Sequence, residues 1–152
     1  MLNSEASKAK IQKLITKKLL EKVVPDRAHA QKLIIQANNH LKSALLALHH
    51  DLEGSYCLIY DAARKSLTAI LSMKGLRATN FGGHAVIFEA LITMCEVDEI
   101  AIVGPFDKMR KRRNAVEYPQ IDRPTVDLDR VENDYEKAQS IVRWAEQQVV
   151  GD

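Results

Sequence analysis

Positive charge gathers in one short segment of this sequence. Five of the six residues from Lys108 to Arg113 are basic, and the cluster runs into the tract Arg113-Asn114-Ala115-Val116-Glu117-Tyr118-Pro119. Guanidinium and ammonium groups bind phosphate oxygens, and several of them close together attract a polyanion. This basic cluster therefore supplies the candidates for binding a nucleic-acid or nucleotide phosphate: Lys108, Arg110, Lys111, Arg112 and Arg113.

Arg113 differs from its basic neighbours because helical spacing places it among apolar residues. Phe106, Met109 and Val116 share one side of the expected helix, and Arg113 falls on that side. A core-facing arginine needs an anion or hydrogen-bond partners, since an unpaired buried charge is costly. Two alternatives follow. Arg113 forms a structural ion pair with Glu117, four residues on, or it lines a cleft and receives a phosphate.

Three further side chains are candidates for the same site. Asn114 offers an amide beside Arg113. Tyr118 lies at the end of the helix, because a residue before proline is disfavoured in the helical conformation, and its ring is free to converge with Arg113 on one ligand. His84 follows two glycines at an expected helix start, where it either binds phosphate or serves as a capping or packing residue.

Several other chemistries are excluded by the sequence. It contains no His-Glu-x-x-His, Walker or nucleophile-elbow motif. His49 and His50 are adjacent and diverge by about 100° on a helix, so we expect no metal site and no cofactor. The formal net charge of +2 indicates no partner by itself.

The cysteines and the hydropathy pattern indicate the cellular compartment that we expect for the protein. Cys57 and Cys95 lie among apolar residues and form no Cys-x-x-Cys pair, so we expect reduced core thiols. The first residues lack the apolar region of a signal peptide, and no apolar run approaches the roughly 18 residues that span a bilayer. We therefore expect a cytoplasmic protein without a membrane segment.

The elements that position the candidate residues are expected to be helices. A chain of 152 residues fits one domain with a sizeable core, and six glycines and four prolines leave little room for loops. Apolar residues recur at intervals of three and four in six segments, 6–24, 26–50, 55–73, 83–95, 106–118 and 125–149. These segments predict an all-α bundle, with the helices at 26–50 and 125–149 packed antiparallel as its spine.

Three of the segments that connect the expected helices are informative. Gly75 is expected to end the third helix as a C-cap glycine, and residues 76–81 are expected to form a loop. Residues 97–104 lack a strand with which to pair, which favours a loop or a short helical turn. Pro119 and Pro124 frame an expected linker.

The chain resembles the HEPN-domain proteins, the higher-eukaryote and prokaryote nucleotide-binding domains, over nearly its whole length. The residues that carry the resemblance, some of them typical of an actinobacterial branch, are the run from Tyr56 to Lys65, Gly75-Leu76-Arg77, Gly82-Gly83-His84, Arg113-Asn114 and Glu117-Tyr118-Pro119. The resemblance implies an up-and-down bundle on residues 26–152 with an added N-terminal helix on 1–25. It also implies a homodimer with a composite cleft between two copies of the motif helix. Many members of the family are metal-independent endoribonucleases, often toxins paired with a nucleotidyltransferase antitoxin.

One position departs from the family's motif, which is arginine, a polar residue, three more positions and then histidine. Arg113 and Asn114 match its first two positions, and Tyr118 stands in the place of the histidine. A histidine titrates near 6.5 and serves as acid or base, whereas tyrosine, near 10, is a poor base at neutral pH. Binding therefore survives this substitution more readily than catalysis does.

These observations leave four hypotheses in order. The first is a HEPN-type module that binds RNA or a nucleotide at Arg113, Asn114 and Tyr118, in a toxin–antitoxin or defence context. The second is a metal-independent endoribonuclease toxin with Tyr118 or His84 in the role of the histidine. The third is a non-catalytic, antitoxin-like module whose basic helix meets an acidic protein. Binding of duplex DNA ranks last, because no helix-turn-helix pattern precedes the basic cluster.

Overall fold

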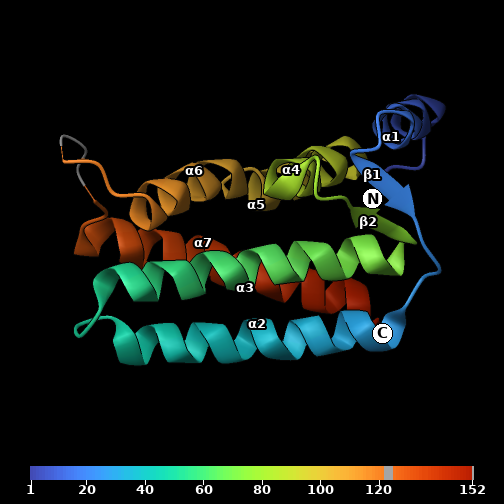
Figure 1. Ribbon diagram of the computed structural model, residues 1–152. Helices are drawn as coiled ribbons and strands as arrows, with labels where there is room; N and C mark the ends of the chain where they lie inside the picture. Colours follow the sequence, from blue (N-terminus) through green and yellow to red (C-terminus); the bar gives the residue numbers. More distant parts are fainter. Residues whose placement is uncertain (122–124, 152) are drawn as a thin grey trace.

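The computed structural model describes residues 1–121 and 125–151, and these residues form seven helices and two short strands (Figure 1). In chain order they are α1 (Glu5–Thr16), β1 (Leu20–Lys22), α2 (Arg27–Ala47), α3 (Leu52–Met73), β2 (Leu76–Ala78), α4 (Gly83–Met94), α5 (Val97–Val103), α6 (Phe106–Glu117) and α7 (Leu128–Val150). The predicted all-α helical bundle is thus confirmed. The helix added to the six predicted ones is α5, where the sequence favoured a loop or a short helical turn.

Helix α3 is the centre of the bundle. Figure 1 shows α2 beside α3, α7 running behind α3, and α4, α5 and α6 along the side of α3 that faces away from α2; α7 contacts both α2 and α3. Helix α3 contacts α2, α4, α6 and α7. It therefore replaces the antiparallel pair 26–50 and 125–149 as the spine of the molecule. The physical reason is its composition, since apolar and small residues occupy several sides of α3 and many of its side chains are buried.

The apolar pattern read from the sequence describes the core well. In α3 the apolar periodicity places six residues on one side, and all six are buried: Tyr56, Tyr60, Ala63, Leu67, Ile70 and Leu71. In α7 the apolar residues at steps of three and four are seven, of which Tyr135 is half-buried, Leu128 is exposed and five are buried: Val131, Ala138, Val142, Ala145 and Val149. Helical periodicity therefore predicted which faces of these helices pack inward.

The first helix is shorter than the sequence predicts. It ends at Thr16, whereas an apolar periodicity running to residue 24 predicted one continuous helix. Lys18 adopts a left-handed backbone with φ of 59°. The amide of Leu19 donates to the carbonyl of Leu14 at 3.1 Å, and that of Lys18 to Ile15 at 2.9 Å. This pair of hydrogen bonds is a Schellman motif, which usually carries glycine at the left-handed position. A lysine there gives no sequence signal of a helix end.

A small antiparallel ribbon replaces part of two expected elements. Strand β1 pairs with β2, with Leu20 opposite Ala78 and Glu21 opposite Arg77. The side chains of Glu21 and Arg77 also form an ion pair at 2.7 Å. The loop expected at 76–81 is therefore wrong for residues 76–78. Strands of three residues are too short for alternating hydrophobicity to reveal them.

The remaining boundaries lie close to their predicted positions. Gly75 follows α3 with φ of 69°, which confirms the C-cap glycine. Helix α7 begins after Asp127, whose carboxylate accepts from the amide of Arg130 at 2.8 Å. The linker expected between Pro119 and Pro124 lies partly outside the described residues. Among the described residues, no helix combines the length and the apolar character that crossing a membrane requires.

Candidate anion-binding site

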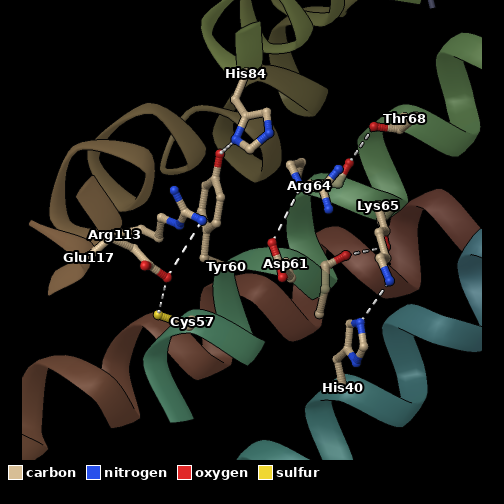
Figure 2. A network of polar contacts seen from close by, with 12 residues as sticks. His40, Cys57, Tyr60, Asp61, Arg64, Lys65, Thr68, His84, Arg113 and Glu117 are labelled. Carbon is tan, nitrogen blue, oxygen red and sulfur yellow. Dashed lines mark hydrogen bonds and ion pairs between the residues drawn. The ribbon is translucent and has the colours of Figure 1, made fainter. Parts of the chain in front are cut away.

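A polar stripe on α3 faces α4 and α6. Cys57, Tyr60, Asp61 and Arg64 follow each other at helical intervals, so they lie on one side of α3. Figure 2 shows His84 of α4 and the α6 pair Arg113 and Glu117 directed towards this stripe. The site therefore combines side chains from three helices that are far apart in the sequence.

Tyr60 stands at the middle of this cluster. Its ring is buried and stacks on Phe106, with the ring centroids 5.3 Å apart and an angle of 16° between the planes. Its hydroxyl lies 2.7 Å from Nδ1 of His84. The guanidinium carbon of Arg113 lies 5.7 Å from the centroid of the same ring, within the range of a cation–π interaction. Tyr60 therefore holds both His84 and Arg113 in place.

Arg113 lies where helical spacing predicts, but its ion pair is weak. The side chain is 26% exposed, and its Nη2 atom is 3.6 Å from Oε1 of Glu117. Within the described part of the chain it donates no hydrogen bond, and its Nε atom is buried without a partner. A guanidinium carries five N–H donors. The structural pair with Glu117 therefore exists, yet it leaves most of the donors of Arg113 available.

Arg64 approaches the rings of Tyr60 and His84 from a different direction than Arg113 does. Figure 2 shows Arg113 and Arg64 on opposite sides of Tyr60. The Nε atom of Arg64 is 3.4 Å from Oδ1 of Asp61, and its side chain is 24% exposed. Two partly exposed guanidinium groups therefore flank the contact between Tyr60 and His84.

The electrostatics of the cluster keep both rings neutral. Burial, followed by the charges of Arg64 and Arg113, lowers the pKa of His84 below its usual 6.5. Burial is the main cause that raises the pKa of Tyr60 above its usual 10. At pH 7 the imidazole is therefore uncharged and the phenol keeps its proton. His84 uses its Nδ1 atom in the contact with Tyr60, which leaves Nε2 as its second ring nitrogen.

Cys57 and Glu117 close the cluster at one end. The Sγ atom of Cys57 donates to Oε1 of Glu117 at 3.3 Å. Burial, together with this carboxylate, raises the pKa of the Cys57 thiol to about 12. The thiol therefore stays protonated, and its structural role is to hold the carboxylate that pairs with Arg113.

The other members of the basic cluster are mostly neutralised by neighbouring acids. Arg110 and Lys111 contact Asp107 at 2.9 and 3.2 Å. Burial alone would raise the pKa of Asp107, but hydrogen bonds from these two cations lower it overall. Lys108 is exposed and forms no ion pair with any residue that the structure describes. The positive charge of the segment is therefore less available than its sequence suggests.

Arg112 serves a different purpose from its neighbours. Its Nη1 atom lies 2.9 Å from Oδ2 of Asp134, which is fully buried in α7. The hydroxyl of Tyr56 donates to the same oxygen at 2.7 Å. Lys137 lies 3.8 Å from the other carboxylate oxygen. Arg112 thus compensates a buried charge and links α6 to α7.

Two of the predicted site residues lie in the solvent. Asn114 is exposed, and Tyr118 is 74% exposed. Neither side chain forms a hydrogen bond to any of the residues described. The structure therefore brings together Arg113 and His84, through Tyr60, and leaves Asn114 and Tyr118 outside these contacts.

Sequence reasoning missed Tyr60 and Arg64 as members of the site. Tyr60 was placed in the core, and Arg64 appeared only within the family resemblance. The spacing of Cys57, Tyr60, Asp61 and Arg64 is a signal that could have found them, since it marks a polar stripe on an otherwise apolar helix.

Acidification is expected to destabilise the protein through His84. Because the folded pKa lies below the unfolded value of about 6.5, the unfolded chain binds more protons below that pH. The contribution of His84 to stability is therefore present above pH 6.5 and lost as the pH falls towards its folded pKa. When the pH falls from 7 to 5, the free energy of unfolding measured in urea should decrease less for His84→Gln than for the wild type. The exposed His29→Gln variant is the matched control, and an equal loss in all three proteins would contradict the expectation.

Comparisons with known proteins give no relative for this chain. No protein-family model matches it, and neither the curated proteins nor the solved structures gave a match. Function is therefore inferred from the residues and the geometry of the site.

Proposed function

We propose that this protein is a HEPN-type module that binds a phosphate group of RNA or of a nucleotide at Arg113, with Arg64 and His84 as further contacts. One observation carries the proposal. The guanidinium of Arg113 lies over the buried ring of Tyr60, 5.7 Å from its centroid and beside His84, and donates no hydrogen bond within the described part of the chain. A rigidly held guanidinium with free donors suits the tetrahedral oxygens of phosphate.

The surroundings of Arg113 favour an anion over other ligands. Arg64 adds a second guanidinium, and Nε2, the second ring nitrogen of His84, adds a hydrogen-bonding group. Asp61 and Glu117 balance part of the positive charge at 3.4 and 3.6 Å, distances at which hydrogen bonding is weak or absent. An entering phosphate would form shorter contacts than these carboxylates do. The exposed ring of Tyr118 is available to stack on a base.

Cleavage of RNA without a metal is a second candidate, favoured by the state of His84. Its imidazole is neutral at pH 7 and is oriented by Tyr60. A base for the ribose 2′-hydroxyl needs both properties. His84 then takes the role that the family motif gives to the histidine at the position of Tyr118. Degradation of RNA in EDTA that is lost in His84→Gln, with binding retained, would support this candidate.

Binding to a labelled single-stranded RNA, followed by fluorescence anisotropy, tests the proposal. We expect Arg113→Ala to weaken binding by about 10- to 100-fold, the effect of losing charge-assisted hydrogen bonds. Lys108→Ala removes one positive charge from the same helix and is the matched control. We expect it to weaken binding only about two- to threefold, because Lys108 is exposed and contributes mainly through screened charge.

The same titration separates the alternatives. Equal losses in Arg113→Ala and Lys108→Ala would indicate a general polyanion patch and contradict a site at Arg113. Tighter binding and a steeper salt dependence for duplex DNA than for RNA would instead favour a DNA-binding helix. Absence of RNA binding at low salt, with a protein that co-purifies, would favour the protein-interaction hypothesis. Circular dichroism of each variant verifies that it is folded.

The biological setting belongs to the same proposal. The family resemblance predicts a homodimer, and in some members a nucleotidyltransferase-type partner within a toxin–antitoxin or defence pair. Cys57 and Cys95 are free thiols, as is usual for proteins of the reducing cytoplasm, where we propose that this protein acts.

A further inference from the structure

A cavity of about 350 Å³ lies where α2, α3 and α7 meet. None of the residues of the candidate anion-binding site lines it. Pockets that bind small molecules begin at about 300 Å³, so the cavity is large enough for a small ligand. The lining residues that determine which ligand it suits are Leu45, Leu48, Ile59, Glu132, Tyr135 and Glu136.

One side of this cavity is apolar. Ile59 is buried and Leu48 is half-buried, while Leu45 is 51% exposed although it lines the same cavity. Small lining residues leave the space open. Ser55 donates its hydroxyl to the carbonyl of Ala44 at 2.8 Å, which holds α3 close to α2 without a side chain large enough to fill the cavity. An apolar group bound here would therefore cover apolar surface.

The α7 side of the cavity carries two carboxylates without a compensating cation. Glu132 and Glu136 are exposed and form no ion pair with any residue that the structure describes, and Lys137 is directed to Asp134 at 3.8 Å instead. The residues three and four positions from each glutamate include no lysine or arginine. The two glutamates are themselves four positions apart, a spacing at which like charges repel each other on a helix. The cavity is therefore complementary in charge to a cation.

Tyr135 lies between the two glutamates on α7, is half-buried, and lines the same cavity. The face of an aromatic ring attracts an ammonium group, and carboxylates pair with it. Together with the apolar side of the cavity, these groups suit an amine with an apolar body. The same carboxylates would repel a phosphate, so the cavity is no extension of the anion-binding site.

We propose that this cavity binds a small organic cation, in which an ammonium group pairs with Glu132 and Glu136 and an apolar body packs against Leu45, Leu48 and Ile59. The inference is independent of the proposed function, because the cavity shares no residue with the anion-binding site and selects the opposite charge.

Phenethylammonium is the probe that tests the proposal, because it joins one ammonium group to one aromatic ring. Nuclear magnetic resonance of the leucine and isoleucine methyl groups reports where it binds. We expect saturable shifts of Leu45, Leu48 and Ile59, with a Kd on the order of 1 mM for a ligand of this size. Methylammonium has the charge without the apolar body, and phenethyl alcohol has the body without the charge. Each should therefore bind at least about fivefold more weakly.

Replacing both Glu132 and Glu136 by glutamine keeps the size of the side chains and removes their charge. We expect this double variant to bind phenethylammonium about five- to tenfold more weakly and to bind phenethyl alcohol as the wild type does. Glu146→Gln removes an exposed charge from α7 outside the cavity and is the matched control, with an expected change of less than about twofold. Tyr135→Leu should weaken binding about threefold, whereas Tyr135→Phe keeps the ring and the affinity.

Three results would overturn this site. They are an alcohol that binds as tightly as the ammonium, equal effects of the double glutamine variant and Glu146→Gln, or no saturable shift of the three methyl-bearing residues at about 20 mM probe, well above the expected Kd. Circular dichroism verifies that each variant is folded. Arg113→Ala should bind the probe as the wild type does, so a failure of the anion-binding site is distinguishable from a failure of this cavity.

Discussion

Replacing Arg112 by alanine is expected to lower the free energy of unfolding by about 3–5 kcal/mol. The carboxylate of Asp134 is fully buried, and Arg112 is the closest cation to it, at 2.9 Å. Without Arg112 the charge of Asp134 keeps only the Tyr56 hydroxyl and a lysine at 3.8 Å. Urea unfolding followed by circular dichroism measures the loss, which corresponds to about 10 °C in Tm for a chain of this size.

The two partners of this ion pair are expected to behave unequally. Arg112 is 25% exposed, so in Asp134→Asn its guanidinium can reach water, and asparagine still accepts from the Tyr56 hydroxyl. We therefore expect Asp134→Asn to cost less than Arg112→Ala, and the double variant to cost less than the sum of the two. Lys108→Ala, from the same cluster, should stay within about 0.5 kcal/mol of the wild type. A cost of Arg112→Ala as small as that of Lys108→Ala would contradict the structural role of this arginine.

Replacing Phe106 by alanine is the second change with a large expected effect. Phe106 is fully buried and stacks on Tyr60 and Phe88, with centroids 5.3 and 6.5 Å apart. The cavity should cost about 3–5 kcal/mol. Because Phe106 supports the ring that holds Arg113 and His84, RNA affinity should also fall in the protein that remains folded.

An exposed phenylalanine provides the control for this prediction. Phe81 is 84% exposed, so Phe81→Ala should change stability by less than about 0.5 kcal/mol. Phe106→Leu keeps most of the buried volume but removes the aromatic stacking, so it should recover much of the stability and less of the affinity. If Phe106→Ala lost stability but bound RNA as tightly as the wild type, Tyr60 would not be the support of the site.

The helical fold was predictable because apolar periodicity reports which side of a helix is buried. The long series in α3 and α7 show this directly, since nearly all their expected core residues are buried. Apolar periodicity did not predict local features of the backbone that leave no pattern in the residue types. Lys18 ends α1 in a left-handed conformation, and β1 and β2 are three residues long. Neither feature leaves a periodic or glycine signal in the sequence.

The site was predictable only in part. Spacing on one helix placed Arg113 towards the core and gave it Glu117 as a partner. Its contact with Tyr60 depends on how α6 packs against α3, and a pattern within one segment carries no such information. Similarly, Arg112 and Asp134 are 22 positions apart, and only the fold shows that this arginine compensates a buried acid. Charge density in the sequence therefore overstated the number of residues free to bind a ligand.

Nuclear magnetic resonance of the arginine Nε–H groups and histidine ring nitrogens, during titration with inorganic phosphate and then a mononucleotide, tests the central claim most directly. We expect the signals of Arg113 and His84 to shift together and to saturate at one ligand concentration. The Nε–H of Arg77, which pairs with Glu21 on the two-stranded ribbon, should stay in place. If the nucleotide binds saturably but the signals of Arg113 and His84 do not shift, the result would contradict a phosphate site at Arg113.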